Sequence, residues 1–239
     1  MKILLIARRE WVSSFRTPVG WLAVAAFPLT ASLFFFVLGA FFQQGVAEMR
    51  AVFGLMPVFL VVFAPALTMR SWAEESRSGT LDLLRSMPFS ESDLTLGKFL
   101  GSFALFATAV LGCAGIPITV SLLGDLDWGP VLAGTLGTLA LGAAFLALGQ
   151  LCSALTRSQV VAWLLAVAAL LAWLLIGFAA TAEAMPAALG RIFLFLDPGL
   201  HFEAATRGVL AAGDVLFLLS MAAFFLFLDW LHLRARPLR

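Results

Sequence analysis

Long apolar runs dominate the pattern of hydrophobic and polar positions, and six of them are long enough to cross a membrane as helices. A transmembrane helix needs about 20 predominantly apolar residues to span the hydrocarbon core of a bilayer. The runs lie at about 18–42, 51–69, 97–123, 129–155, 159–181 and 212–233. The pattern therefore predicts an all-α polytopic membrane protein with six transmembrane helices, in a single domain over residues 1–239.

The composition agrees with a membrane protein, because 62% of the residues are hydrophobic and only 12% are charged. A soluble domain carries about 25% charged residues. The formal net charge of +1 argues against nucleic-acid binding, which requires a strongly basic surface. The two cysteines, Cys113 and Cys152, lie in apolar runs without Cys or His neighbours at metal-ligand spacing. We interpret them as buried packing residues.

The basic residues are distributed unevenly between the two sides that six spans define. Six crossings place both termini on one side, together with the loops that follow the second and fourth spans. That side carries 12 of the 15 Lys and Arg residues, and the other side carries Arg50, Arg191 and Arg207. Lys and Arg are enriched in cytoplasmic loops, so the pattern predicts that both termini are cytoplasmic.

The first 16 residues, MKILLIARREWVSSFR, predict a short amphipathic helix that lies in the membrane interface. Arg8, Arg9 and Arg16 are expected to meet lipid headgroups. The expected apolar face consists of Ile3, Leu4, Ile6, Ala7 and Trp11. The alternative interpretation is a simple basic anchor that holds the N-terminus in the cytoplasm.

The segment between the fifth and sixth spans, about residues 183–213, is apolar although its apolar runs are too short to cross a membrane. We expect this outer segment to re-enter the outer leaflet or to lie along its surface. Glu203 and Arg207 are four residues apart, so a helix lets their side chains pair. We interpret this pair as structural rather than catalytic.

Small residues recur every four positions in the fourth span, at Gly134, Thr138 and Gly142. Small residues at this spacing let two helices approach closely. The pattern leaves open whether the partner helix belongs to the same chain or to a second copy.

The sequence has none of the motifs expected of a membrane-embedded enzyme or of an ATP-binding subunit. It contains no H-E-x-x-H, no G-x-S-x-G and no P-loop. No predicted span has a charge at its centre, which argues against a proton- or sodium-coupled carrier. We therefore expect no catalytic, cofactor or metal site on this chain, and an ATP-driven transporter would carry its ATPase on another chain.

The loop between the second and third spans, residues 71–92, is the one charged and amphipathic segment inside the apolar chain. Gly79 is expected to end a first short helix, and Thr80 to cap a second one. Leu81 and Leu84 then share an apolar side, and the following Met-Pro ends the helix. Such a short amphipathic helix inserts into a groove of a partner protein or lies flat on lipid. The pattern of residues is compatible with both.

This loop resembles that of a known family, the permeases of type-2 ABC exporters. The matching run is MRSWAEExRxGTLxLLxSxP at 69–88, followed by LGK at 96–98. In that family an E-x-x-x-G-T-(L/I)-x-L-L-x-(S/T)-x-P stretch lies between spans two and three. The run FEAATRGV at 202–209, with Asp214 after it, is similar to the permease of the gliding-motility-associated ABC transporter and to related multidrug-type permeases.

The resemblance implies that this chain is a permease that works with a separate cytoplasmic ATPase dimer, which binds ATP and Mg. Two permease chains, identical or related, would pair, and each would seat its loop helix in an ATPase subunit. The implied contacts are Glu74, Glu75, Arg77, Gly79, Thr80, Leu81, Leu84 and Pro88. The N-terminal helix, with Arg8, Arg9 and Trp11, would abut the same ATPase, and the outer segment, with Glu203 and Arg207, would shape the exit.

The resemblance further implies a location in the bacterial cytoplasmic (inner) membrane, where ATP hydrolysis would drive export or conformational work. A gliding-type system would add an accessory membrane protein with an extracytoplasmic domain. The alternative hypotheses are an ATP-independent channel or carrier, and a membrane scaffold that transmits force to an extracytoplasmic partner.

Overall fold

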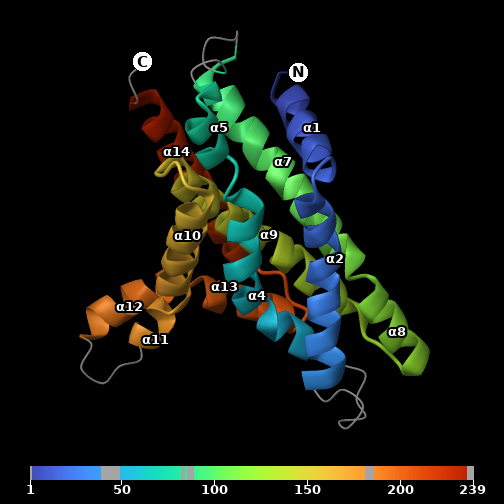
Figure 1. Cartoon of the computed structure of the whole chain (residues 1–239). Coiled ribbons are helices and arrows are strands. Elements are labelled where there is room, and N and C mark those ends of the chain that lie inside the picture. Colours follow the sequence, from blue (N-terminus) through green and yellow to red (C-terminus); the bar gives the residue numbers. More distant parts are fainter. Residues whose placement is uncertain (1, 39–48, 82–83, 85–88, 181–185, 236–239) are drawn as a thin grey trace.

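The chain folds into a bundle of helices, shown in Figure 1. The computed structural model describes residues 2–38, 49–81, 84, 89–180 and 186–235, and within these residues every regular element is helical. The elements are α1 (Lys2–Phe15), α2 (Pro18–Leu33), η1 (Phe34–Leu38), α4 (Arg50–Thr68), α5 (Ala73–Ser78), α7 (Glu91–Gly112), α8 (Gly115–Leu123), α9 (Trp128–Ala154), α10 (Gln159–Leu174), α11 (Ile176–Ala180), α12 (Ala187–Leu196), α13 (Pro198–Thr206) and α14 (Ala212–Ala235).

Among the described residues, six helical segments are long and apolar enough to cross a membrane, which confirms the number of spans that the sequence predicts. The segments are Gly20–Val37, Arg50–Ser78, Glu91–Leu123, Trp128–Ala154, Gln159–Ala179 and Ala212–Ala235. The expected ends of the first and fifth spans, at residues 42 and 181, lie outside the described residues.

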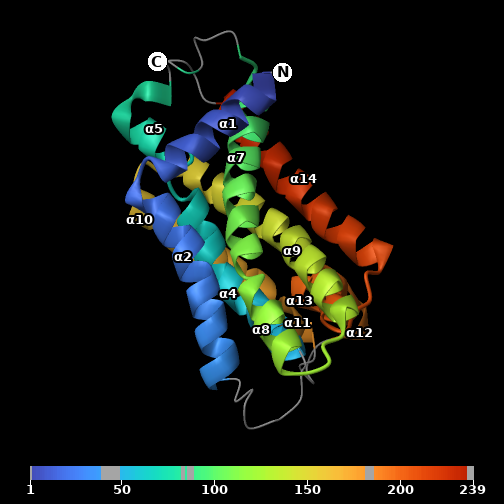
Figure 2. The ribbon, with the colours of Figure 1, turned by 90° about the vertical axis from the view of Figure 1, so that its right-hand side faces the viewer.

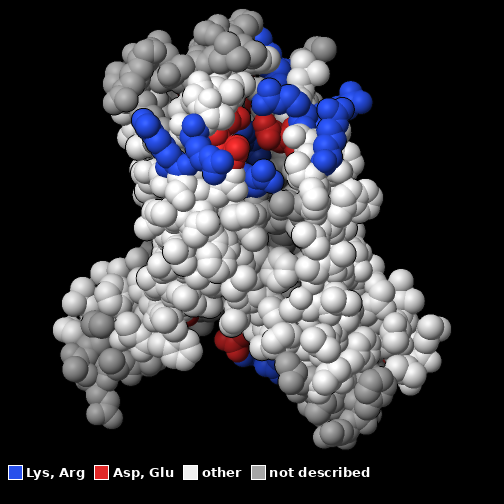
Figure 3. All heavy atoms as spheres, viewed as in Figure 1, with Lys and Arg blue, Asp and Glu red and all other residues white. Residues whose placement is uncertain are grey.

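The long segments alternate in direction, so the chain begins and ends at the same end of the bundle (Figures 1 and 2). Helices α1 and α5 and the last turns of α14 mark this end. Figure 3 shows that Lys and Arg side chains gather there, around a smaller group of acidic side chains. We call it the basic end, and we call the opposite end, where α11, α12 and α13 lie, the far end.

Helix α9 is the centre of the bundle, because it packs against α14, α4, α10, α13 and α7. Its glycines let large side chains lie directly on its backbone. A Cβ atom at Gly134 would meet the ring of Phe53 on α4, and one at Gly142 would collide with the ring of Phe106 on α7. The small residues of the fourth span therefore serve contacts within the chain, which answers the question that their spacing leaves open.

We expect Gly142→Ala to destabilise the protein by about 1–3 kcal/mol, because the added methyl group overpacks the contact with Phe106. The matched control is Gly54→Ala in the interior of α4, where an added Cβ meets no atom within 4 Å. That change should be neutral or slightly stabilising, since alanine favours helix more than glycine does. Thermal unfolding of both variants in detergent measures the difference, and equal melting temperatures would contradict this packing.

Helix α1 packs along the first half of α7, where two glycines four residues apart allow a close approach. A Cβ atom at Gly97 would lie 2.6 Å from the Cβ of Ile6, and one at Gly101 would lie 2.5 Å from the Cβ of Glu10. The N-terminal segment is thus helical as predicted, but its expected apolar face is divided. Ile6 is buried against α7, whereas Leu4 is 68% exposed.

Helix α7 begins six residues before the predicted third span, because a capping box starts it. The Ser90 hydroxyl accepts a hydrogen bond from the Asp93 backbone N–H, and the Asp93 carboxylate accepts one from the Ser90 N–H, both at 3.1 Å. These bonds satisfy two backbone donors that a helix start leaves without partners. The early start places Lys98 inside the helix, on the side that faces the bundle.

The outer segment forms two short helices at the far end, joined at Asp197. The Asp197 carboxylate accepts a hydrogen bond of 2.8 Å from the Gly199 N–H and so caps α13. Helix α13 packs on α9, α14 and α4, whereas α12 packs on α11. Glu203 and Arg207 form the ion pair that their spacing predicts.

Candidate functional site: a charged loop held at the basic end

The chain between α4 and α7 contains the loop that carries the candidate coupling residues. Helix α5 ends at Gly79, whose φ of 73° lies in the left-handed region that glycine adopts most easily. Thr80, Leu81 and Leu84 are again helical. The helix break at Gly79 is therefore as predicted. Residues 82–83 and 85–88, which include the candidate Pro88, lie outside the described residues.

Hydrogen bonds to one side chain of the core helix α9 fasten the start of α5. The Ser153 hydroxyl accepts from the N–H groups of Trp72 and Ala73, each at 3.1 Å, and it donates to the Met69 carbonyl at 3.0 Å. Ser153, Trp72 and Ala73 are fully buried. A single side chain on α9 thus provides hydrogen-bond partners for three backbone groups of the turn that leads from α4 into α5.

A buried carboxylate connects the same turn to α14. The Asp229 Oδ2 accepts hydrogen bonds from the Trp72 indole N–H at 3.0 Å and from the Gln150 amide at 2.8 Å. The Gln150 amide also donates to the Thr95 carbonyl of α7 at 3.0 Å. Asp229 and Gln150 have no solvent exposure. One polar network therefore joins the loop, α7, α9 and α14.

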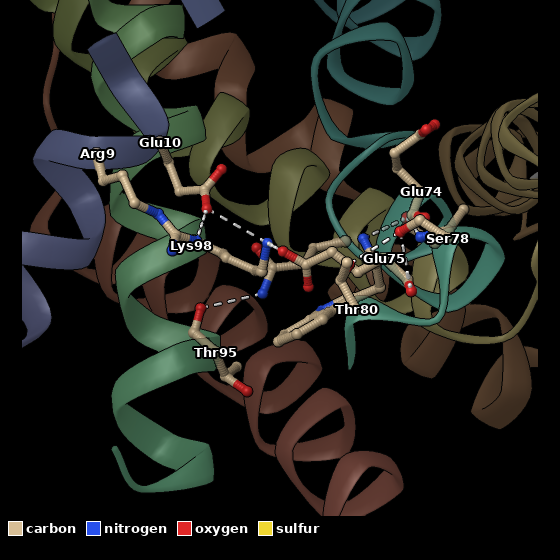
Figure 4. A network of polar contacts seen from close by, with 12 residues as sticks. Arg9, Glu10, Glu74, Glu75, Ser78, Thr80, Thr95 and Lys98 are labelled. Atoms are coloured by element: carbon tan, nitrogen blue, oxygen red, sulfur yellow. Dashed lines mark hydrogen bonds and ion pairs between the residues drawn. The ribbon is translucent and has the colours of Figure 1, made fainter. Parts of the chain in front are cut away.

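Lys98 forms a second network, in which it lies between a carboxylate of α1 and one of α5 (Figure 4). Its ammonium group is 2.6 Å from Glu75 and 3.4 Å from Glu10, and it lies 4.9 Å from the centre of the Trp72 ring. Arg9 contacts the same Glu10 oxygen at 2.9 Å. The Lys98 side chain is only 3% exposed. A buried charge of this kind is tolerated where it is paired.

The burial of Glu10 and its basic neighbours together change the pKa of its carboxyl group. Burial alone would raise the pKa of Glu10, but attraction to Lys98 and the hydrogen bond from Arg9 outweigh burial and hold the pKa below its ordinary value of 4.5. A depressed pKa means that the fold favours the carboxylate. This contribution to stability is therefore present above about pH 4.5 and is lost as the pH falls further.

The structure divides the predicted ATPase contacts into inward-facing and exposed residues. Glu75 faces Lys98, and Glu74 accepts a hydrogen bond from Gln159 at the start of α10. Arg77, Gly79 and Thr80 are exposed. On α1, Arg8 and Arg9 are exposed and Trp11 is 37% exposed. The outer residues Glu203 and Arg207 lie at the far end and belong to a different part of the molecule.

The two leucines of the loop are buried in their own chain. Leu81 is 8% exposed and Leu84 is 7% exposed. Leu81 belongs to a small apolar cluster at the basic end whose other buried members are Ile6, Trp72, Leu94, Ala154 and Leu233. The exposed described residues of the loop lie in the turn from Arg77 to Thr80 and at Ser90 and Ser92, and neither leucine is among them.

Sequence reasoning missed the residues that hold the loop: Ser153, Gln150, Asp229, and the inward roles of Lys98 and Glu10. A signal for them was present in the sequence. The basic ends of the predicted spans contain Ser153, Gln150, Asp229 and Lys98. Polar side chains at such places need partners from neighbouring helices. The pairing itself required the packing of α1 on α7 and of α14 on α9.

Six apolar helices that alternate in direction, with their charges gathered at one end, define a polytopic membrane protein. The family model described as "ABC-2 family transporter protein" matches residues 4–233, so the chain belongs to that family. The "Probable multidrug ABC transporter permease YbhS" of Escherichia coli K12 is 28% identical over 193 residues, which cover 77% of this chain and 50% of that protein. The protein of the same description from Escherichia coli O157:H7 matches equally. The chain spans about half the length of these curated relatives.

Proposed function

We propose that this chain is the membrane-spanning permease subunit of an ATP-binding cassette transporter in the bacterial cytoplasmic membrane. ATP with Mg would bind to a separate cytoplasmic ATPase dimer, and hydrolysis there would drive export or conformational work through this chain. Membership of the ABC-2 family and the likeness to a permease described as multidrug support this proposal. The basic end would face the cytoplasm, since Lys and Arg are enriched there.

The observation that carries the proposal is the way in which α5 and the turn before it are fastened to the bundle. Ser153 holds this segment to α9, Asp229 holds it to α14, and Lys98 holds it to α7. Gln159 adds a bond from α10, and Lys98 reaches α1 through Glu10. A displacement of the loop would therefore act on five helices at once. An ATPase that moved this loop would rearrange the whole basic end.

The exposed turn from Arg77 to Thr80 is the part of the loop that we assign to contact with the ATPase. A second permease chain, identical or related, would complete the assembly with its own turn on the second ATPase subunit. Within this proposal the relation to gliding-motility permeases, and the accessory membrane protein with an extracytoplasmic domain that such a system would add, stay predictions.

We expect Arg77→Glu to weaken co-purification of the cognate ATPase about tenfold or more, because reversing an exposed interface charge places like charges against each other. The matched control is Arg191→Glu, which reverses an exposed arginine on α12 at the far end. Both variants should insert into the membrane and melt as the natural chain does. The readout is the amount of ATPase retained on the tagged permease in mild detergent.

Undiminished ATPase retention by Arg77→Glu would contradict the assignment of the turn. Absence of any ATPase on the natural chain would contradict the permease proposal itself. Leu81→Asp is unsuitable for this test, since Leu81 is buried against Trp72 and Leu94 and the variant would disturb the fold together with the docking surface.

A further inference from the structure

His201 on α13 connects three elements of the far end through its two ring nitrogens. Nδ1 lies 2.7 Å from the Asp214 carboxylate at the start of α14. Nε2 lies 2.9 Å from the backbone carbonyl oxygen of Phe195 on α12. The imidazole therefore bridges α12 and α14 from its place on α13.

Both neighbours of the ring are acceptors, and this determines how many protons the ring must carry. A carbonyl oxygen never donates a hydrogen bond, and an ionised carboxylate also only accepts. A neutral imidazole has one N–H donor and one bare nitrogen, so it can satisfy one of these contacts and must place a lone pair against the other oxygen. The imidazolium form has two N–H donors and satisfies both.

The surroundings of the ring favour the same protonated form. The ring of Phe217 stacks on it at 4.0 Å, and the ring of Phe195 meets it edge-on at 5.9 Å. A cation over the face of an aromatic ring is attracted by its electron density. The His201 side chain is 12% exposed and Asp214 is 27% exposed, so a proton can exchange with water.

Other charged groups on the elements packed around His201 have different partners or face solvent. Asp197 caps α13, and Glu203 pairs with Arg207. Arg191 on α12 and Arg50 on α4, which packs on α13, are exposed. Helices α9 and α10 contain no Asp, Glu, Lys or Arg. The charged residues nearest to the start of α9 in the sequence are Asp125 and Asp127, which precede its first turn. Among the described residues, Asp214 is the charged side chain that contacts the ring.

We propose that His201, Asp214 and the Phe195 carbonyl form a proton-binding site that fastens the outer segment to the start of α14. With the proton bound, the imidazolium holds α12 and α13 against α14. Release of the proton to water breaks one of the two hydrogen bonds and loosens the segment. The state of the far end thus depends on the pH of the compartment that it faces. This inference concerns the permease alone and is independent of the proposed ATPase contact.

The pH dependence has a defined sign. Both ring nitrogens have satisfied contacts only when the ring carries both protons. We therefore expect the site to hold the outer segment in mild acid and to release it as the pH rises.

The proton count is tested directly by 15N NMR of histidine in the purified full chain in detergent. The chain has two histidines, so His232→Gln leaves His201 as the single signal. We expect both ring nitrogens to show the shifts of protonated imidazolium at pH 7.5, where a free histidine is mostly neutral, and Asp214→Asn to shift the ring towards a neutral tautomer at the same pH. A neutral tautomer at pH 7.5 in the variant that retains Asp214 would overturn the proposal.

The mechanical consequence is tested by thermal unfolding and by hydrogen exchange at pH 5.5 and pH 8. We expect the melting temperature of the natural chain to fall on this change of pH by about 2–4 °C more than that of His201→Gln. Exchange in residues 187–206, corrected for the intrinsic effect of pH, should rise at pH 8 in the natural chain. Asp214→Asn provides a second variant, should His201→Gln fail to fold. An equal change of melting temperature between pH 5.5 and pH 8 in the natural chain and in the variants would show that the site does not hold the outer segment against α14.

Discussion

Lys98→Met is expected to destabilise the protein by about 3–5 kcal/mol, because it removes one partner from a buried charge network. Methionine retains much of the apolar stem, so the loss reports the ammonium group rather than a large cavity. Glu75 and Glu10, which are only 15% and 27% exposed, would be left without the cation between them. Thermal unfolding in detergent measures the loss, and increased hydrogen exchange in α1 would show that this helix separates from α7.

Two further variants separate this explanation from a general effect of the substitution. Lys2→Met replaces the other lysine of the chain, which is exposed at the start of α1, and should leave the melting temperature nearly unchanged. Lys98→Met combined with Glu75→Gln should recover part of the loss, since one of the stranded carboxylates becomes neutral. A single Lys98→Met variant as stable as the natural chain would show that the network contributes nothing.

Asp229→Ala is expected to have the second largest effect, about 3 kcal/mol, because it leaves buried donors without an acceptor. The Trp72 indole N–H loses its partner, and the Gln150 amide loses one of its two. The variant should also release the turn before α5 from α14, so that trypsin or hydrogen exchange detects a more accessible loop. The measurement combines thermal unfolding with exchange in residues 69–81.

Asp229→Asn is the conservative companion, because the amide oxygen can still accept both hydrogen bonds. We expect it to lose less than half as much stability as Asp229→Ala. Asp125→Ala, at an exposed aspartate between α8 and α9, is the control for loss of a carboxylate elsewhere. If the Ala and Asn variants were equally unstable, the charge of Asp229 rather than its hydrogen bonds would be the important property.

Much of the fold was predictable, because each transmembrane helix satisfies its own backbone hydrogen bonds and is recognised by length and apolarity. The second span illustrates this: residues 51–69 were expected, and α4 covers Arg50–Thr68. The third span shows the limit. Its polar first turns, from Glu91 to Lys98, have no apolar signature, and they are helical because Ser90 and Asp93 cap them and α1 covers them.

The loop and its helix break were predicted, but the contacts of its side chains within the chain were not. The break at Gly79 follows from the conformational freedom of glycine, a local property that a sequence reveals. The direction in which Leu81 and Glu75 face is not local. Both were expected to meet an ATPase, and both contact their own chain, because α1, α7 and α14 supply Ile6, Lys98 and Leu233 around them. Whether an ATPase also touches Leu81, Glu74 and Glu75 stays a prediction.

From the sequence alone follow the properties that depend on neighbouring residues: six apolar helices, an amphipathic first helix, a charged loop, and an uneven distribution of basic residues. Only the tertiary structure decided which polar groups meet. Lys98 is 88 positions from Glu10, and Trp72 is 157 positions from Asp229. Contacts of such range depend on how the helices pack, and close packing through glycines such as Gly97 is what brings these charged groups within reach of one another.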